Sequence, residues 1–222
     1  MLHLGSIGRT TIDIDLSFII VVGLWVTLSY NAEQGIQYAL LWVPVLFISV
    51  LVHELAHAGT IALFGYGASR IILGGMGGVT FNERRARPWH DLLISLAGPI
   101  SSFGLALALA WLFRNYSFLR TDKMLQALLP LLITMNIYWA FLNLVPVPPL
   151  DGGQAVRSFL RMFLEEVPAF IIAVWIAIVA GAAVSIWAFT KELYFVALFV
   201  AWFAYQNFQA WQYFRDHGIP GD

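Results

Sequence analysis

The sequence alternates between long apolar stretches without Asp, Glu, Lys or Arg and short polar connections. A helix that crosses the hydrocarbon core of a bilayer needs about 20 consecutive, mostly apolar residues. The pattern therefore predicts about six transmembrane helices in one membrane domain that spans residues 1–222. The helices are expected over residues 16–32, 37–63, 91–113, 124–145, 168–190 and 193–214.

Two segments depart from the helical pattern. Thr11–Asp15 alternates polar and apolar residues with a period of two, which predicts a short N-terminal strand. Two apolar runs flank the glycine-rich segment Gly74–Gly78, which predicts a β-hairpin. The expected fold class is thus an all-α polytopic membrane protein with a short strand and a glycine-rich hairpin.

Composition agrees with a membrane protein. Hydrophobic residues make up 60% of the chain and charged residues 11%, with a mean hydropathy of +0.77, whereas soluble domains contain about 25% charged residues. This excludes an ordinary soluble domain and a disordered chain. The net charge of −1 gives no indication of a nucleic-acid partner. Because the chain has no cysteine, any metal must be held by His, Asp or Glu.

The distribution of Lys and Arg predicts the orientation in the membrane. If the N-terminus is inside, the inner segments hold 8 of these residues and the outer segments 4, so both termini are expected in the cytoplasm. The inner residues are Arg9, Arg70, Arg84, Arg85, Arg87, Arg157, Arg161 and Arg215, and the outer residues are Arg114, Arg120, Lys123 and Lys191.

The second apolar stretch contains three ionisable residues, His53, Glu54 and His57, within five positions. Residues i and i+4 of a helix lie on one face, so His53 and His57 can hold one zinc ion with Glu54 beside it as general base. This spacing also arises by chance in soluble proteins, but ionisable residues inside a membrane helix are costly and indicate function. The sequence therefore predicts one Zn²⁺ per chain and a catalytic Glu54.

A catalytic zinc site has three protein ligands, so one more must come from elsewhere. Glu83 lies in a basic, polar stretch, and Glu165 and Glu166 begin a span. Asp151, by contrast, follows a proline-rich run at residues 146–149. Three prolines in four positions cannot continue a regular helix, and irregular backbone at membrane depth is tolerated only inside protein or beside a watery cavity. The alternative is that Asp151 caps the helix that follows it.

Depth along the helices favours Asp151 as the third ligand. If the second helix enters the membrane near Gln37, His53 lies 16 residues further along, roughly 24 Å into a core of about 30 Å. The fourth helix runs in the same direction and brings Asp151 toward the same inner face. His53, His57 and Asp151 are therefore the expected metal ligands, inside the membrane and nearer the cytoplasmic face.

At these residues the chain resembles the site-2 protease family of intramembrane zinc peptidases. The resemblance rests first on His53-Glu54-x-x-His57 and on Asn143-x-x-Pro146-x-Pro148-x-Leu150-Asp151-Gly152. The glycine run Gly74–Gly78 and Ala97-Gly98-Pro99 extend it. Order and spacing fit from about Ile12 to Gly153, which is about two-thirds of the chain.

The resemblance implies a six-helix core, zinc held by two His and one Asp, and cleavage of transmembrane protein segments within the bilayer. It implies Glu54 as the base and Asn143 as a substrate or oxyanion contact. It also implies that the hairpin dips into the membrane and pairs with an extended substrate through Gly74, Gly75, Gly77 and Gly78. A plain tight turn is the alternative interpretation of these glycines.

The chain departs from the family pattern in two respects. Many relatives have a His where this chain has Asp15, and many have PDZ or CBS domains, which are not expected within residues 1–222. An upstream protease is a further expected partner, and the oligomeric state is open. Two other functions remain open: a zinc protease of the prenyl-protein processing type with a Glu ligand, and an inactive zinc-binding or transport protein.

Overall fold

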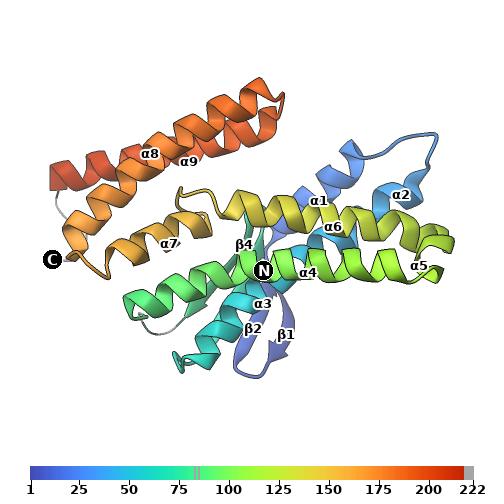
Figure 1. Ribbon diagram of the computed structural model, residues 1–222, viewed down its shortest axis with the longest axis horizontal. Helices are drawn as coiled ribbons and strands as arrows, with labels where there is room; N and C mark the ends of the chain where they lie inside the picture. Colours follow the sequence, from blue (N-terminus) through green and yellow to red (C-terminus); the bar gives the residue numbers. More distant parts are fainter. Residues whose placement is uncertain (83, 85, 218–222) are drawn as a thin grey trace. The chain divides into compact units, whose positions relative to one another are not determined.

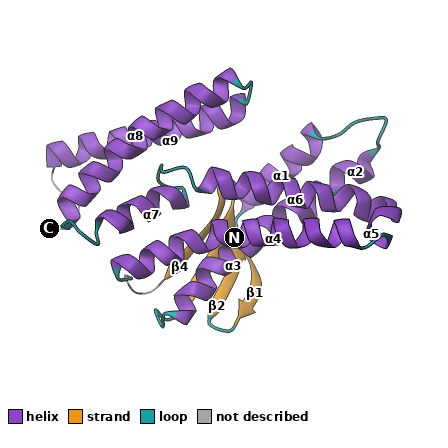
Figure 2. Ribbon diagram, viewed as in Figure 1, coloured by secondary structure: helices purple, strands orange, loops and turns teal. Residues whose placement is uncertain are grey.

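The computed structural model describes residues 1–82, 84 and 86–217, and most of them are helical (Figures 1 and 2). The expectation of a mostly helical integral membrane protein is confirmed. Glu83, weighed as a metal ligand, and Arg85, counted among the inner charges, lie outside the described residues. The chain divides into two compact units, residues 1–85 with 97–141 and residues 86–96 with 142–222.

The first unit combines a small sheet with several helices. Its strands are β1 (Leu2–Ile7), β2 (Thr10–Ile14), β3 (Ser69–Gly74) and β4 (Gly77–Asn82). Its helices are α1 (Leu16–Leu28), α2 (Ile36–Leu40), α3 (Trp42–Leu63), the greater part of α4 (Pro88–Asn115), α5 (Phe118–Thr121) and most of α6 (Lys123–Asn143).

The four strands form one sheet in the order β1-β2-β3-β4. β2 pairs parallel with β3, from Thr10 opposite Ser69 to Ile14 opposite Leu73, and the other two pairings are antiparallel. β2 lies where the sequence predicts the N-terminal strand. The sequence did not reveal β1, whose residues are mostly exposed and whose apolar alternation is interrupted at Gly5.

One face of the sheet packs against the helices of the first unit. Ile12, Ile71 and Leu73 of the central strands are buried in one apolar cluster with Phe18 of α1 and Val50 of α3. Both β3 and β4 contact α3. The sheet is therefore fixed against the helix that contains the candidate zinc ligands.

An ionic contact joins three strands of the sheet. The buried Asp13 carboxylate in β2 binds His3 Nδ1 of β1 at 2.8 Å and Arg70 Nε of β3 at 2.6 Å. Its hydrogen bond with His3, followed by that with Arg70, holds the pKa of Asp13 below its ordinary value. Asp13 therefore stabilises the strand order as a carboxylate.

Asp15 immediately precedes α1 and caps its start. Its side chain accepts hydrogen bonds from the Ser17 amide at 3.0 Å and from the Ser17 hydroxyl at 2.6 Å. These bonds lower the pKa of Asp15, the hydroxyl bond most. Asp15 therefore acts as an N-cap, which satisfies a backbone donor at the start of the helix.

Among the described residues, four helical segments are long and apolar enough to cross a membrane: Ile36–Leu63, Pro88–Asn115, Lys123–Asn143 and Glu166–Thr190. α1 has 13 residues, which at 1.5 Å per residue is about 20 Å and shorter than a hydrocarbon core of about 30 Å. The expectation of six spans therefore stays a prediction.

The second unit contains the start of α4, α7 (Asp151–Leu160), α8 (Glu166–Thr190) and α9 (Tyr194–His217). α8 and α9 lie side by side (Figure 1). A Cβ on Gly181 of α8 would lie 2.7 Å from the Ala204 Cβ of α9, so the absence of a side chain permits this close packing. Val147 and Leu150 of the preceding loop pack with Phe203 of α9.

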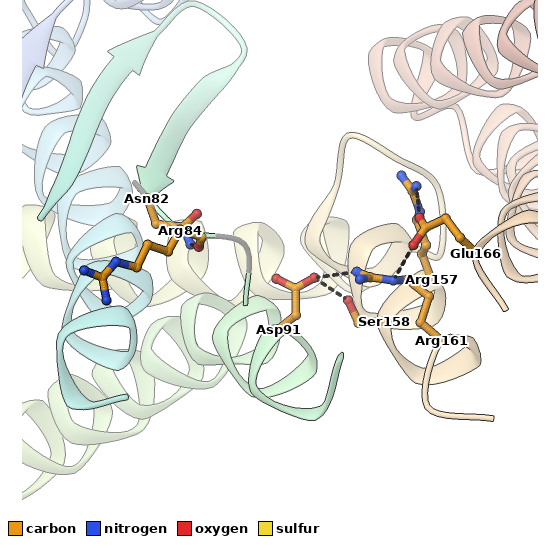
Figure 3. Close-up of polar contacts among 7 residues, drawn as sticks. All are labelled: Asn82, Arg84, Asp91, Arg157, Ser158, Arg161 and Glu166. Atoms are coloured by element: carbon orange, nitrogen blue, oxygen red, sulfur yellow. Dashed lines mark hydrogen bonds and ion pairs between the residues drawn. The ribbon is translucent and has the colours of Figure 1, made fainter. Parts of the chain in front are cut away.

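Charged side chains connect the ends of three helices in the second unit (Figure 3). Arg161, the residue after α7, contacts Asp91 of α4 at 3.5 Å and Glu166 of α8 at 2.9 Å. Arg157 contacts Glu166 at 2.6 Å, and Ser158 donates a hydrogen bond to Asp91 at 3.0 Å. These residues therefore form a structural network around the end of α7.

We predict that Asp13→Asn loosens β1, because an amide replaces a carboxylate bound by two donors. Since the folded pKa of Asp13 lies below its ordinary value of 3.8, its contribution is complete above that value and is lost as the pH falls through the folded pKa. Hydrogen exchange of β1 amides at pH 7 should be faster in the variant than in wild type. Asp216→Asn is the control, and equal exchange in Asp13→Asn and wild type would refute the prediction.

Candidate metal centre

His53 and His57, the predicted metal ligands, and Glu54, the predicted catalytic base, are buried residues of α3. His53 is 2% exposed, Glu54 4% and His57 6%. One helical turn separates the histidines, and their ring centroids are 4.9 Å apart. The helix therefore places two imidazoles side by side, as the i, i+4 spacing predicts.

α4 passes close to both imidazoles at Gly98. A Cβ at this position would collide with the Nε2 atoms of His57 and His53. The α4 backbone can therefore approach the histidines only because residue 98 has no side chain. This gives a physical reason for the Ala97-Gly98-Pro99 segment noted in the sequence.

Ser102, one turn further along α4, is fully buried and hydrogen-bonds His53, with its Oγ 3.1 Å from Nδ1. When Nδ1 donates to this hydroxyl, Nε2 keeps its lone pair for a metal ion. Metal-binding histidines commonly have such a partner for their other ring nitrogen. Sequence reasoning missed Ser102, because a serine in an apolar helix has no distinguishing local pattern.

Asp151 is the first residue of α7 and is half-buried. The loop before it is tightly folded, since a Cβ on Gly152 or Gly153 would collide with the backbone of Leu144 or Pro148. The peptide bond between Pro148 and Pro149 is cis. The Pro-rich run thus ends α6 and begins α7, as the sequence indicated.

The α9 helix supports this loop through Asn207. Its amide nitrogen donates to the Pro148 carbonyl at 2.7 Å and to the Phe203 carbonyl at 2.8 Å. Asn207 is buried. The last helix, which contributes no recognisable motif to the sequence, therefore holds the segment that precedes Asp151.

The three predicted ligands can offer one metal-binding atom each. His53 and His57 belong to the first unit and Asp151 to the second. Two imidazole nitrogens and one carboxylate oxygen form a donor set typical of catalytic zinc. The residues therefore fit a zinc ion.

The residues expected to bind substrate occupy two places. Asn143 is buried at the last position of α6. The glycines lie where β3 turns into β4: the Gly75 amide donates to Ser17 Oγ at 2.9 Å, and Gly77 has a φ of +118°, which favours glycine. A Cβ on Gly78 would collide with the Glu54 side chain.

Thr80 in β4 is a second residue that the sequence did not reveal. Its hydroxyl oxygen lies 2.7 Å from Glu54 Oε2. Thr80 follows Gly78 by two positions, so both residues lie on the same face of the strand. The period-two alternation of β4 indicates this face, but only the packing against α3 identifies its neighbour.

Comparison with known proteins gives two family matches. Residues 16–147 match the family described as "Peptidase M50B-like", and residues 119–188 match "Peptidase family M50". Together these segments cover His53, Glu54, His57 and Asp151.

Individual relatives agree with these matches. A zinc metalloprotease of Methanocaldococcus jannaschii is 30% identical over 72% of this chain and 45% of its own length. Stage IV sporulation protein FB of Bacillus subtilis is 32% identical over 65% of this chain and 47% of its own length. The chain thus spans about half the length of the curated relatives it matches.

A solved structure has a similar fold. The site-2 protease from Methanocaldococcus jannaschii superposes with a TM-score of 0.63 and 26% sequence identity. The match covers 93% of this chain and 94% of that one.

We predict that Gly98→Ala weakens zinc binding. Overpacking of a filled site costs about 1–3 kcal/mol, equivalent to about 5- to 150-fold in affinity if the imidazoles must move. Gly104→Ala is the matched control, since it lies on the same helix and its Cβ would meet nothing within 4 Å. The zinc content of both variants is measured at limiting free zinc, where Gly98→Ala should bind less zinc than Gly104→Ala. Equal zinc affinity in both variants would contradict the proposed role of Gly98.

Proposed function

The chain belongs to the peptidase M50 family of site-2 proteases, and from this premise we propose that it is an intramembrane zinc metalloprotease. It hydrolyses peptide bonds within or near the transmembrane segments of membrane proteins. The observation that carries this proposal is the buried group of His53, Glu54 and His57 on an apolar helix. Three ionisable residues at this spacing are costly in a membrane helix unless they serve the chemistry of a metal.

His53, His57 and Asp151 hold one zinc ion per chain in this proposal. When bound, zinc supplies Lewis acidity and lowers the pKa of a water molecule to about 7. Ser102 fixes the orientation of the His53 ring through the hydrogen bond at Nδ1. Gly98 keeps the space between α4 and the two imidazoles clear.

Glu54 moves the protons of the reaction. Its carboxylate accepts a proton from the attacking water and later returns it to the leaving amine, which is general base and then general acid catalysis. The Asn143 amide donates a hydrogen bond to the oxygen of the scissile carbonyl as negative charge develops there. Each residue is buried, which excludes bulk water from the reacting groups.

The substrate binds as an extended strand beside the hairpin. A transmembrane helix hides its amides in its own hydrogen bonds, so it must unwind locally before cleavage. Among the described residues β4 lies at the edge of the sheet, and an unwound segment can add to that edge through backbone hydrogen bonds. Gly74, Gly75, Gly77 and Gly78 permit close approach, and the hairpin lies at membrane depth.

The proposed orientation has both termini in the cytoplasm and the zinc site nearer the cytoplasmic face. The excess of Lys and Arg in the inner segments supports it. The proposed partners are then the bilayer and a membrane-protein substrate, with an upstream protease as a further candidate.

We predict that Glu54→Gln separates metal binding from catalysis. Purified wild type and variant should both contain about one zinc per chain, while cleavage of a tagged transmembrane peptide falls by at least about 100-fold in the variant, because the base is lost. Mass spectrometry of the products and metal analysis give both readouts. Absence of zinc from both proteins, or undiminished cleavage by the variant, would refute the proposal.

We also predict that Asp151→Ala lowers zinc content, since it removes one of three ligands. Asp216→Ala, at an exposed position near the end of α9, is the control. A prenyl-protein processing type of site, with Glu as third ligand, would instead retain its zinc in Asp151→Ala. Metal analysis after dialysis against a weak chelator separates the two.

A further inference from the structure

Strand β4 passes directly over the glutamate of α3. Gly78 and Thr80 lie on one face of the strand, and both are next to the Glu54 side chain. Val79 and Phe81 alternate with them and are exposed. On the face of β4 toward α3, Gly78 therefore makes room for Glu54 and Thr80 binds it.

The Thr80 hydroxyl contacts Glu54 at two points. It lies 2.7 Å from Oε2 of the carboxylate and 3.3 Å from the backbone carbonyl oxygen of the same residue. The hydroxyl has one hydrogen to donate, and the shorter distance assigns it to the carboxylate. A donor on the sheet thus holds the glutamate side chain relative to the helix to which it belongs.

A fixed carboxylate matters for proton transfer. A glutamate side chain has several rotatable bonds, and a general base must lie within about 2.6–3.2 Å of the proton it accepts or reach it through one water. A displacement of about 1 Å in a reacting group can cost about 100-fold in rate. Thr80 restricts this freedom from a strand that is itself held by β3 and packed on α3.

We propose that Thr80 is a positioning residue for the catalytic base: its hydroxyl holds the Glu54 carboxylate in the orientation for proton transfer. This rests on the proposed protease function. Because Thr80 belongs to the edge strand of the sheet, the strand that aligns an extended substrate also aligns the base. The same strand, β4, then sets the position of the scissile bond and of the carboxylate that accepts the proton.

The test compares four purified variants of the chain with wild type. Thr80→Val removes the hydroxyl and keeps the shape, and Thr80→Ser keeps the hydroxyl. Thr80→Ala is a second variant without the hydroxyl, should the valine variant fail to fold by size-exclusion chromatography. Thr11→Val in β2 is the matched control, the same change in the same sheet.

We expect Thr80→Val to lower kcat for the tagged transmembrane peptide by about 10- to 100-fold. KM should stay within about twofold, with zinc content near one per chain, because substrate and metal contacts remain. Thr80→Ser should keep kcat within about threefold of wild type. Thr11→Val should match wild type.

The outcomes separate the two hypotheses. Wild-type kcat in Thr80→Val overturns the positioning role and leaves the protease function intact. Equal losses in the serine and valine variants, or a loss of zinc in parallel with activity, indicate a structural role for Thr80 and also overturn the inference. A wild-type protein that contains zinc but cleaves no transmembrane peptide overturns the proposed function, and the positioning role falls with it.

Discussion

The first unit depends on one constraint: three ionisable side chains of α3 are buried among apolar helices. A buried polar group is costly unless other groups bind it, and an ionisable one more so. Ser102 binds His53 and Thr80 binds Glu54. Near each of these hydrogen bonds lies a glycine whose Cβ would collide with the buried side chain. Gly98 leaves room for the two histidines, and Gly78 leaves room for Glu54. Ser102, Thr80 and Gly98 take no direct part in the proposed chemistry. Their identity is nevertheless restricted by the buried ionisable side chains that they contact.

The sequence predicts the part of this site that is local. His53 and its two neighbours follow from helical periodicity alone, and Asp151 follows from counting depth along two helices together with the family resemblance. Ser102 and Thr80 could not be found this way, because hydroxyl residues are common in helices and strands. Only the packing of α4 and β4 against α3 gives them a partner. The outer strand β1 was missed for the same reason, since its pairing rather than its sequence makes it a strand.

The second unit shows how charges interpreted as surface features can be structural. By sequence alone, Arg161 counts only among the inner charges and Glu166 only as the start of a span. Instead they bind each other, and Arg161 also reaches Asp91 (Figure 3). Ion pairs of this kind are less screened by salt when partly buried, as the Arg161 side chain is. Together with Asn207 at the other end, they hold the short helix that begins at Asp151.

The parallel pairing of β2 with β3 has a consequence for how the protein is made. Thr10 and Ser69 are partners across 59 residues of chain, and α1, α2 and α3 lie between them. Contacts between residues so distant in sequence form slowly, because the entropy cost of closing a long loop comes before the favourable energy of the contacts is gained. During synthesis α3, which contains the two histidines, leaves the ribosome before β3 does, so the sheet can close only after this helix has been made. The order of the strands along the chain therefore also sets the order of assembly: α3 is made first, and the four-stranded sheet that packs on it is completed afterwards.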